Sequence, residues 1–429
     1  MDEELKAFAR AVRARDAAAT RAAIEKSAHV RAHVNDPLFD FGQRAAHIVA
    51  RDPAVLDVLL SFGADLNLRS EWENGPYTVL DNADAESARF LIARGAALTA
   101  CAAARLGWFD ELKAFVASDP LAVHERGGDG QQPLHQATTV AIADYLLDNG
   151  ADIDARCTDH QSTPAQYALV ERPDVCRRLL ERGATPDIFM AARLGDRSLA
   201  QRLVEEHPAC VAARVNLPGY PPVPPFNIYC WTLGFLVSPH VVALAHEHRD
   251  VYDLLIAQSS GTVRLLDAVE RGDEVAAHAM VAADPSLIEA LMPADQGVLA
   301  QAIFHGRYVS ADLMLRLGFD PSRPGVDGGT ALHAACWVGH APLVGRILAS
   351  GRVPIDTVDA THGSTPLGWA AFGSTHRCAE GADYVAVIDE LVRAGADVRL
   401  AGNRHGTSVV SMADGNAAVQ AALRRHGAV

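Results

Sequence analysis

The stretch LLDNGAD, residues 146–152, contains the phrase that decides the fold of this chain. Variants of the phrase return along the sequence, each with a leucine-rich run, a glycine, and then small or polar turn residues. The glycines of these phrases are Gly63, Gly95, Gly150, Gly183, Gly318, Gly395 and Gly427. Gly150 and Gly183 are 33 residues apart, and Gly63 and Gly95 are 32 apart. A period near 33 residues with helix–turn–helix content predicts a stacked solenoid.

Each phrase has a physical cause. A glycine after a leucine-rich helix is a C-terminal cap, because the chain enters the left-handed region there without a Cβ penalty. The aspartate that follows, such as Asp152, suits a turn. A second type of unit ends at Asp-Pro or His-Pro instead, and proline past a helix end also stops the helix. Units of this second type lie near Trp108, Asp196 and Asp273.

A further phrase lies upstream of the cap. Residues 330–340 read TALHAACWVGH, in which a threonine cap opens a short helix of small residues that stops at Gly339. Residues 365–367, 133–135 and 162–164 carry the same kind of opening. These segments resemble the ankyrin repeat, with its Thr-Pro-Leu-His-x-Ala-Ala opening and leucine-rich second helix. The resemblance, to an ankyrin repeat protein of bacterial type, implies an all-α solenoid of stacked helix–turn–helix units with short hairpin connections.

The resemblance extends over nearly the whole chain of 429 residues. About thirteen units of the 33-residue period fit this length, so we expect residues 1–429 to form a single array. The first stretch, residues 1–36, is interpreted as a degenerate N-terminal capping repeat. Residues 405–429 are interpreted as the C-terminal capping repeat.

Two units carry insertions. Residues 216–237 are proline-rich and cannot form a helix or a central strand. This insertion is either a binding flap or an irregular packed connection, and the sequence leaves both open. We expect residues 218–236 to lie against the concave side of the solenoid, with Tyr229 or Trp231 at least half-buried. Residues 373–383 are interpreted as a longer loop between the two helices of their unit.

Composition and charge limit the partners and the compartment. The formal net charge is −15, and no basic stripe is visible, which argues against nucleic acid or an anionic membrane as the partner. We find no long apolar run and no secretory leader. The seven cysteines are scattered without a CxxC pair, which favours a reduced, cytoplasmic protein. Abundant alanine and scarce lysine are typical of a GC-rich, bacterial genome.

The candidate binding residues follow from the resemblance. In the ankyrin pattern, the last positions of the first helix face the concave groove. Large or polar side chains stand at these positions where packing does not require them, which resembles the composition of interfaces. They are Arg105, Arg193, His246, Phe304, His305, Trp337 and Phe372, to which the insertion adds Tyr229 and Trp231.

Metal or catalytic chemistry has little support in the sequence. His246, His305, His376 and Cys378 are weak candidates for metal ligands, since no pair has a helical or knuckle spacing. His135 and His333 fall on the family's cap histidine, which the resemblance implies is satisfied within the repeat. Nucleotide-binding, metalloprotease and hydrolase motifs are absent from the sequence, so we expect no cofactor and favour a non-enzyme.

Two functions remain open. The first is a scaffold that binds a protein or peptide through its concave groove. The second is an unusual enzyme or small-molecule receptor, whose pocket lies between the groove strip and the proline-rich insertion. The inserted loops and the aromatic groove residues are needed more by the second function than by the first.

Overall fold

The computed structural model describes residues 2–429, and within them the chain is an all-α repeat solenoid, as the sequence predicts. These residues form no β-strand, and only two isolated bridges occur, Phe39 with Gln43 and Ala401 with Ser408. In the same residues, every helix is too short or too polar to cross a bilayer.

The chain divides into two compact units. Unit 1 comprises the chain up to Asp196 together with Tyr220–Leu233. Its helices are α1 (Glu3–Arg13), α2 (Ala17–Lys26), α3 (Ala28–Ala32), η1 (Asp40–Gly42), α4 (Ala45–Ile48), α5 (Pro53–Ser61), α6 (Ala85–Ile92), α7 (Ala100–Leu106), α8 (Phe109–Ser118), η2 (Pro120–His124), η3 (Gly128–Gly130), α9 (Pro133–Gln136), α10 (Val140–Asp148), α11 (Pro164–Ala168), α12 (Pro173–Glu181), α13 (Ile188–Leu194) and α15 (Tyr229–Thr232).

Unit 2 comprises Arg197–Gly219 and Gly234–Val429. Its helices are α14 (Arg197–Glu206), η4 (Pro208–Ala212), α16 (Pro239–Ala245), α17 (Arg249–Ala257), α18 (Gly261–Glu270), α19 (Glu274–Ala283), α20 (Ser286–Glu289), α21 (Pro293–Gln296), α22 (Val298–Phe304), α23 (Tyr308–Leu317), η5 (Val326–Gly328), α24 (Ala331–Trp337), α25 (Ala341–Ala349), α26 (Pro366–His376), α27 (Tyr384–Arg393), α28 (Val409–Met412) and α29 (Ala417–Arg425). That both units form one continuous array of about thirteen repeats stays a prediction.

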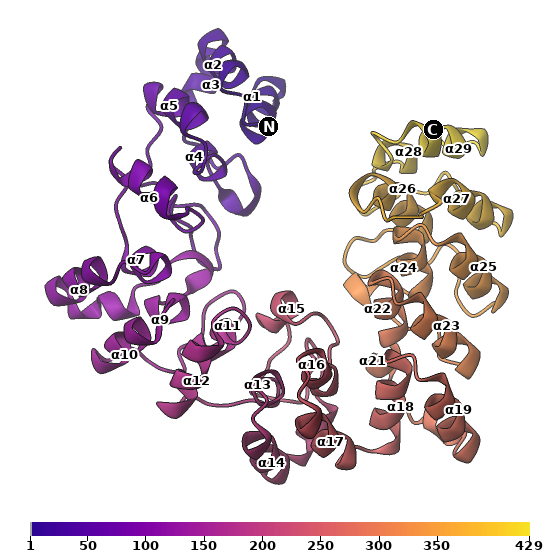
Figure 1. Ribbon diagram of the computed structural model, residues 1–429. Helices are drawn as coiled ribbons and strands as arrows, with labels where there is room; N and C mark the ends of the chain where they lie inside the picture. The colour runs from indigo at the N-terminus through magenta and orange to yellow at the C-terminus, as the bar shows by residue number, and fades with distance from the viewer. Residues whose placement is uncertain (1) are drawn as a thin grey trace. The chain divides into compact units, whose positions relative to one another are not determined.

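The helices of unit 2 stack in two rows (Figure 1). The first helices α22, α24, α26 and α28 follow one another in one row, while the second helices α23, α25, α27 and α29 form the other. Buried alanines such as Ala335 and Ala371 lie within the first row. Small side chains let neighbouring helices approach closely, so the larger residues at the helix ends are not required for stacking.

The predicted glycine caps are confirmed. Gly63, Gly150, Gly183, Gly351 and Gly395 have φ of 85°, 90°, 100°, 64° and 104°, all in the region that favours glycine. At Gly395 the backbone N–H donates to the carbonyl of Val392, and the next N–H, of Ala396, donates to Leu391. The glycine therefore ends α27 while satisfying carbonyls that the helix itself leaves open.

A histidine network joins successive repeats. In α24 the Thr330 N–H donates to Nδ1 of His333 at 3.1 Å, so the ring proton lies on Nε2, which donates to the Ser364 carbonyl of the next repeat at 3.1 Å. His135 makes the same two bonds, to Gln132 N and to the Ser162 carbonyl. The expectation that these two histidines are satisfied inside the repeat network is confirmed.

The proline-rich insertion divides between the units. Its middle, Tyr220–Leu233, belongs to unit 1, whereas its flanks belong to unit 2. The flanks are paired by hydrogen bonds from Val215 N to the Val237 carbonyl and from Leu236 N to the Val215 carbonyl, both 3.0 Å. A buried guanidinium supports them, since Arg214 donates to the Leu236 carbonyl and pairs with Glu270 at 2.9 Å.

The second insertion is shorter than the sequence predicts. Gly373–His376 are not loop, because they form the last turn of α26, which runs from Pro366 to His376. The connection to α27 therefore begins at Arg377. The turn can continue because a Cβ on Gly373 would stand 2.5 Å from the Trp337 carbonyl oxygen, and glycine removes that clash.

Replacing a cap glycine tests the solenoid geometry. We expect Gly395→Val to lower the free energy of unfolding by about 1–3 kcal/mol, because a β-branched residue is strained at positive φ. No atom lies within 4 Å of a Cβ at this position, so the loss comes from the backbone alone. Gly345→Ala, inside α25, is the control and should stabilise by about 0.5–1 kcal/mol. Urea unfolding measures the free energy of unfolding of both variants. Equal stability of the two would contradict the role of Gly395 as a C-terminal cap.

The buried histidines make stability depend on pH. Burial lowers the pKa of His333 to about 4, against about 6.5 when unfolded. The unfolded chain therefore binds more protons between these values, so the stabilisation is complete above about pH 6.5 and is lost as the pH falls towards about 4. His333→Gln should keep the bond from the N-cap N–H, which Gln166 accepts in α11. It should reduce the loss of unfolding free energy between about pH 7.5 and about pH 5 by up to about 2 kcal/mol, because glutamine does not titrate. Urea unfolding at both pH values is the measurement, and an unchanged decline would refute this role.

Candidate functional site

Large aromatic side chains gather at the ends of the first helices of unit 2. Phe304 ends α22, Trp337 ends α24, and Trp369 and Phe372 lie in α26. The rings of Phe304 and Trp337 are parallel, with centroids 6.2 Å apart, and the centroid of Trp337 is 6.1 Å from those of Trp369 and Phe372. These four residues form what we call the aromatic ladder.

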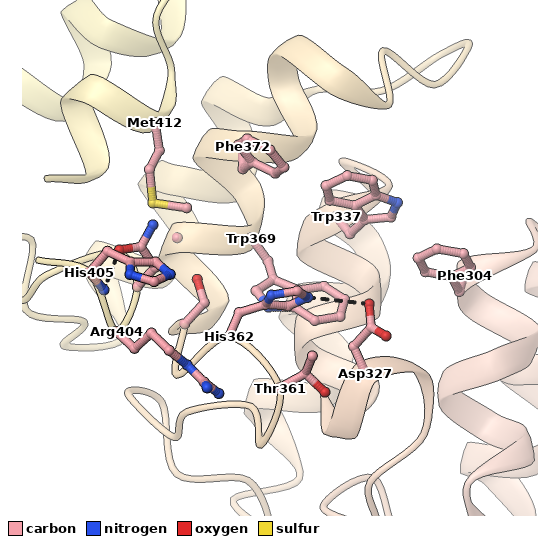
Figure 2. Close-up of a pocket in the computed structure, with 13 residues that line it drawn as sticks. Phe304, Asp327, Trp337, Thr361, His362, Trp369, Phe372, Arg404, His405 and Met412 are labelled. Atoms are coloured by element: carbon pink, nitrogen blue, oxygen red, sulfur yellow. Dashed lines mark hydrogen bonds and ion pairs between the residues drawn. The ribbon is translucent and has the colours of Figure 1, made fainter. Parts of the chain in front are cut away.

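The aromatic ladder forms one wall of a pocket of about 510 Å³. Figure 2 shows Trp369 in the middle of the pocket, Phe304 at one border, and Arg404, His405 and Met412 towards the opposite border. The hairpin connections of three successive repeats add Asp327, Thr361, His362, Ser364 and Asn403 to the lining, and Gly368 of α26 completes it. A pocket of this volume that combines large aromatic side chains with several polar groups is typical of a ligand site.

Hydrogen bonds fix the floor of the pocket. Trp369 is buried, and its indole N–H donates to Oδ2 of Asp359 at 2.8 Å. The Trp337 backbone carbonyl accepts the Tyr384 hydroxyl at 3.0 Å, which holds the end of α24. In contrast, the buried Nε1 of Trp337 has no acceptor among residues 2–429. Leaving a buried indole N–H without a partner costs free energy, which an acceptor from a bound molecule would offset.

Charged groups border the pocket at the hairpin connections. Nε2 of His362 lies 3.5 Å from a carboxylate oxygen of Asp327, and both side chains are exposed. The Arg404 guanidinium donates to the Ala360 carbonyl at 2.9 Å, which keeps it beside the pocket. Ser364 is the serine of the lining and would be the candidate nucleophile. It is buried, and its hydroxyl donates to the Gly402 carbonyl.

The structure brings together part of the predicted strip. Phe304, Trp337 and Phe372 all line the pocket, and Phe372 is 40% exposed. His305 is next to Phe304 and is exposed, with its Nε2 2.6 Å from the side-chain nitrogen of Gln301. His246 is exposed at the end of α16 and does not line this pocket.

The two predicted arginines lie in unit 1 and bind backbone. Arg105 donates to the carbonyls of Leu80 and Ala83 at 2.7 Å and 2.5 Å, and Arg193 donates to the Val170 carbonyl at 3.3 Å. Each guanidinium therefore joins its helix to the preceding repeat, and burial lowers the pKa of Arg105. These contacts give both arginines a structural role, and a groove contact for either of them stays a prediction.

The two aromatic residues of the insertion have different environments. Tyr229 is completely buried, and its hydroxyl donates to Oδ2 of Asp187 at 2.9 Å. The expectation that one of the two is at least half-buried is confirmed, but a completely buried Tyr229 holds the insertion to α13 and does not face a partner. Trp231 is 59% exposed, with its ring centroid 4.5 Å from that of His160.

The weak metal candidates do not converge. Within residues 2–429, His246, His305, His376 and Cys378 do not enter a group of three possible ligand atoms within 4.8 Å of one another. The Phe372 ring stacks on His376 at 3.7 Å, while the Cys378 thiol donates to the Ser374 carbonyl. A different trio does lie together in unit 1, formed by Asp129, Asp159 and His160. Tyr77 and Asn74 already bond its two carboxylates.

Sequence reasoning missed most of the pocket lining. Trp369 lies one helical turn before Phe372, and the sequence alone does not distinguish it from a core residue. Its large side chain among the small residues of α26 is the signal that could have indicated a pocket residue. The hairpin residues Asp327, His362 and Arg404 lie beside the aromatic ladder only because consecutive repeats stack. Their spacing of about one repeat, 35 residues from 327 to 362 and 42 from 362 to 404, is the signal that could have found them.

The fold and the pocket define a helical repeat protein with a ligand-sized aromatic site. Residues 129–158 match the family model described as Ankyrin repeat. The chain is also similar to Protein PhlB of Serratia liquefaciens, with 27% identity over 135 residues. That match covers 32% of this chain and spans 58% of the length of the relative. The chain thus contains an ankyrin repeat, a motif of protein–protein interaction.

The anchoring of the insertion is testable at Tyr229. We expect Tyr229→Phe to lower the free energy of unfolding by about 1–3 kcal/mol, because it removes one donor from the buried Asp187 carboxylate. Tyr145→Phe is the matched control, since its hydroxyl has no hydrogen-bond partner among the described residues, and it should be close to neutral. Thermal unfolding compares the two variants. Similar melting temperatures would show that the hydrogen bond from Tyr229 to Asp187 does not stabilise the insertion.

Proposed function

We propose that this protein is a binding scaffold that recognises a protein or peptide partner, and that the aromatic pocket of unit 2 receives an apolar side chain of that partner. The observation that carries the proposal is the aromatic ladder, in which Phe304 and Trp337 at helix ends and Phe372 one turn before the end of α26 are partly exposed. Large aromatic residues in a concave site are the usual anchors of protein recognition.

Packing alone does not explain these residues. The close approach of the first helices depends on alanines, among them Ala334 and Ala370, which are buried. Phe372 remains 40% exposed, and the buried indole N–H of Trp337 has no acceptor within the described chain. A peptide that crosses the ladder would cover the exposed rings and could offer a backbone carbonyl to Trp337.

A small molecule is the second candidate, favoured by the volume of about 510 Å³, which lies in the range of small-ligand pockets. Catalysis has weaker support, because Ser364 is buried and bonded to a backbone carbonyl instead of to a base. A roof formed by the proline-rich insertion is not part of the proposal. Tyr220–Leu233 bonds within its own unit, where the Pro222 carbonyl accepts from Nε2 of Gln166 and the Ile228 N–H donates to the Ser162 hydroxyl oxygen.

The proposal predicts a hot spot at Trp337. Trp337→Ala should weaken binding of a peptide or protein partner by about 2 kcal/mol or more. Its effect on stability should be smaller than the loss for a core residue, since the ring lies at the edge of the stack. Leu400→Ala is the control, an exposed apolar residue outside the pocket, and should leave affinity unchanged. Calorimetric titration measures the affinity, and an unchanged affinity in folded Trp337→Ala protein would reject this site.

A further inference from the structure

Basic side chains gather beside the aromatic ladder. His305 and Arg307 follow α22, and Arg377 follows α26. Burial lowers the pKa of His305, and the positive charges of Arg307 and Arg377 lower it further. The His305 and Phe304 ring centroids are 5.5 Å apart. Helix α24 contacts both α22 and α26, so Arg307 and Arg377 follow the two helices that flank α24.

These arginines differ from several in the second helices of unit 2, which are paired with carboxylates. Arg316 pairs with Glu274 at 2.6 Å, and Arg393 pairs with Glu390 at 2.7 Å. Neither Arg307 nor Arg377 has a carboxylate within 4.0 Å in the part of the chain that the structure describes. A buried atom of Arg307, Nε, also has no acceptor there. Because Arg377 is exposed and Arg307 is partly exposed, their terminal N–H groups are available to an external carboxylate, which a guanidinium binds strongly.

The opposite border of the pocket is basic as well. Arg404 and His405 line it, and Arg404 is exposed, with one bond to a backbone carbonyl and no carboxylate partner. Asp327 is the one carboxylate of the lining, and His362 faces it at 3.5 Å. Figure 2 shows Arg404 on one side of Trp369 and Phe304 on the other, and His305 and Arg307 follow Phe304 in the chain.

The basic groups at the border of the pocket contrast with the net charge of −15 of the whole chain. At physiological ionic strength, charges are screened beyond about 8 Å, so a bound molecule responds to the local groups more than to the distant net charge. A basic border around an apolar pocket matches a partner with an apolar anchor between negative charges, because electrostatic complementarity selects the partner.

We infer that the aromatic pocket is a docking site for an acidic peptide segment, in which aspartate and glutamate residues flank one apolar anchor side chain. The anchor would lie against Trp337 and Trp369. Acidic residues on one side would pair with Arg307 and Arg377, and those on the other side with Arg404. The inference rests on the proposed function, which it narrows to one class of peptide.

A selection experiment tests the class of peptide. The full chain is presented to a display library of random dodecapeptides, and binders are counter-selected on folded Trp337→Ala protein. We expect the retained peptides to be enriched in aspartate and glutamate around a tryptophan, phenylalanine or leucine. Enrichment in lysine and arginine would overturn the inference while leaving a peptide-binding pocket. Recovery of no peptide that depends on Trp337 would overturn the proposed function itself.

Charge reversal then tests the basic residues directly. The best acidic peptide is labelled, and its affinity is measured by fluorescence polarisation on Arg307→Glu/Arg377→Glu protein. We expect binding at least about tenfold weaker, because two attractive contacts become repulsive. The control, Arg202→Glu/Arg424→Glu, changes the net charge equally at exposed arginines elsewhere in unit 2 and should stay within about twofold.

Two further readouts keep the result interpretable. Arginines at helix ends also stabilise the helix dipole by about 0.3–1 kcal/mol, so circular dichroism and thermal unfolding are recorded for every variant. A version of the peptide with lysine in place of each acidic residue should bind more weakly than the original to the unmodified chain. Equal losses in the two charge-reversal variants, or equal affinity for the two peptides, would show that the basic border does not select the partner.

Discussion

The repeat structure depends on one hydrogen-bonded side chain that acts in two directions. The histidine of the third helical position accepts from the backbone N–H at the start of its own helix and donates to a carbonyl of the next repeat. His47, His135 and His333 each do this, with Tyr77, Ser162 and Ser364 as the respective acceptors. Each bond satisfies a backbone donor that the helix leaves open and fixes the spacing between neighbours.

A change in that side chain accompanies the insertion in unit 1. In α11 the equivalent position is Gln166, whose Oε1 accepts from Thr163 N at 3.0 Å. Its Nε2 donates to the Pro222 carbonyl at 2.9 Å and lies 3.2 Å from Oδ2 of Asp187. An amide has two N–H donors where a neutral imidazole has one, so glutamine reaches both the next helix and the insertion. The proline-rich segment is thereby bonded into the repeat network.

The same division between stacking and recognition residues explains the pocket. Alanines in the first helices allow close approach, which brings successive helix ends into register. Any large residue at those ends then meets its counterpart from the next repeat, as Trp337 meets Phe304 and Phe372. The regular stacking also aligns the hairpin connections, so polar residues from three loops surround one aromatic wall. The site therefore arises from the repeat spacing, with no single repeat containing it.

The sequence by itself determined the repeat unit, because the cap glycines and the cap histidines act through local geometry. The pattern of a few neighbouring residues is enough to predict that α27 ends before Gly395 and that His333 caps the start of α24. Phe304, Trp337 and Phe372 could be predicted as a set because they occupy equivalent positions in successive repeats. The tertiary structure alone decided which large side chains are structural. Arg105 binds carbonyls of the preceding repeat, and Tyr229 is buried against Asp187, contacts that depend on neighbours far away in sequence. It also decided that Trp369 and the loops at Asp327, His362 and Arg404 share one pocket, since their proximity follows from the stacking of separate repeats and not from any local pattern.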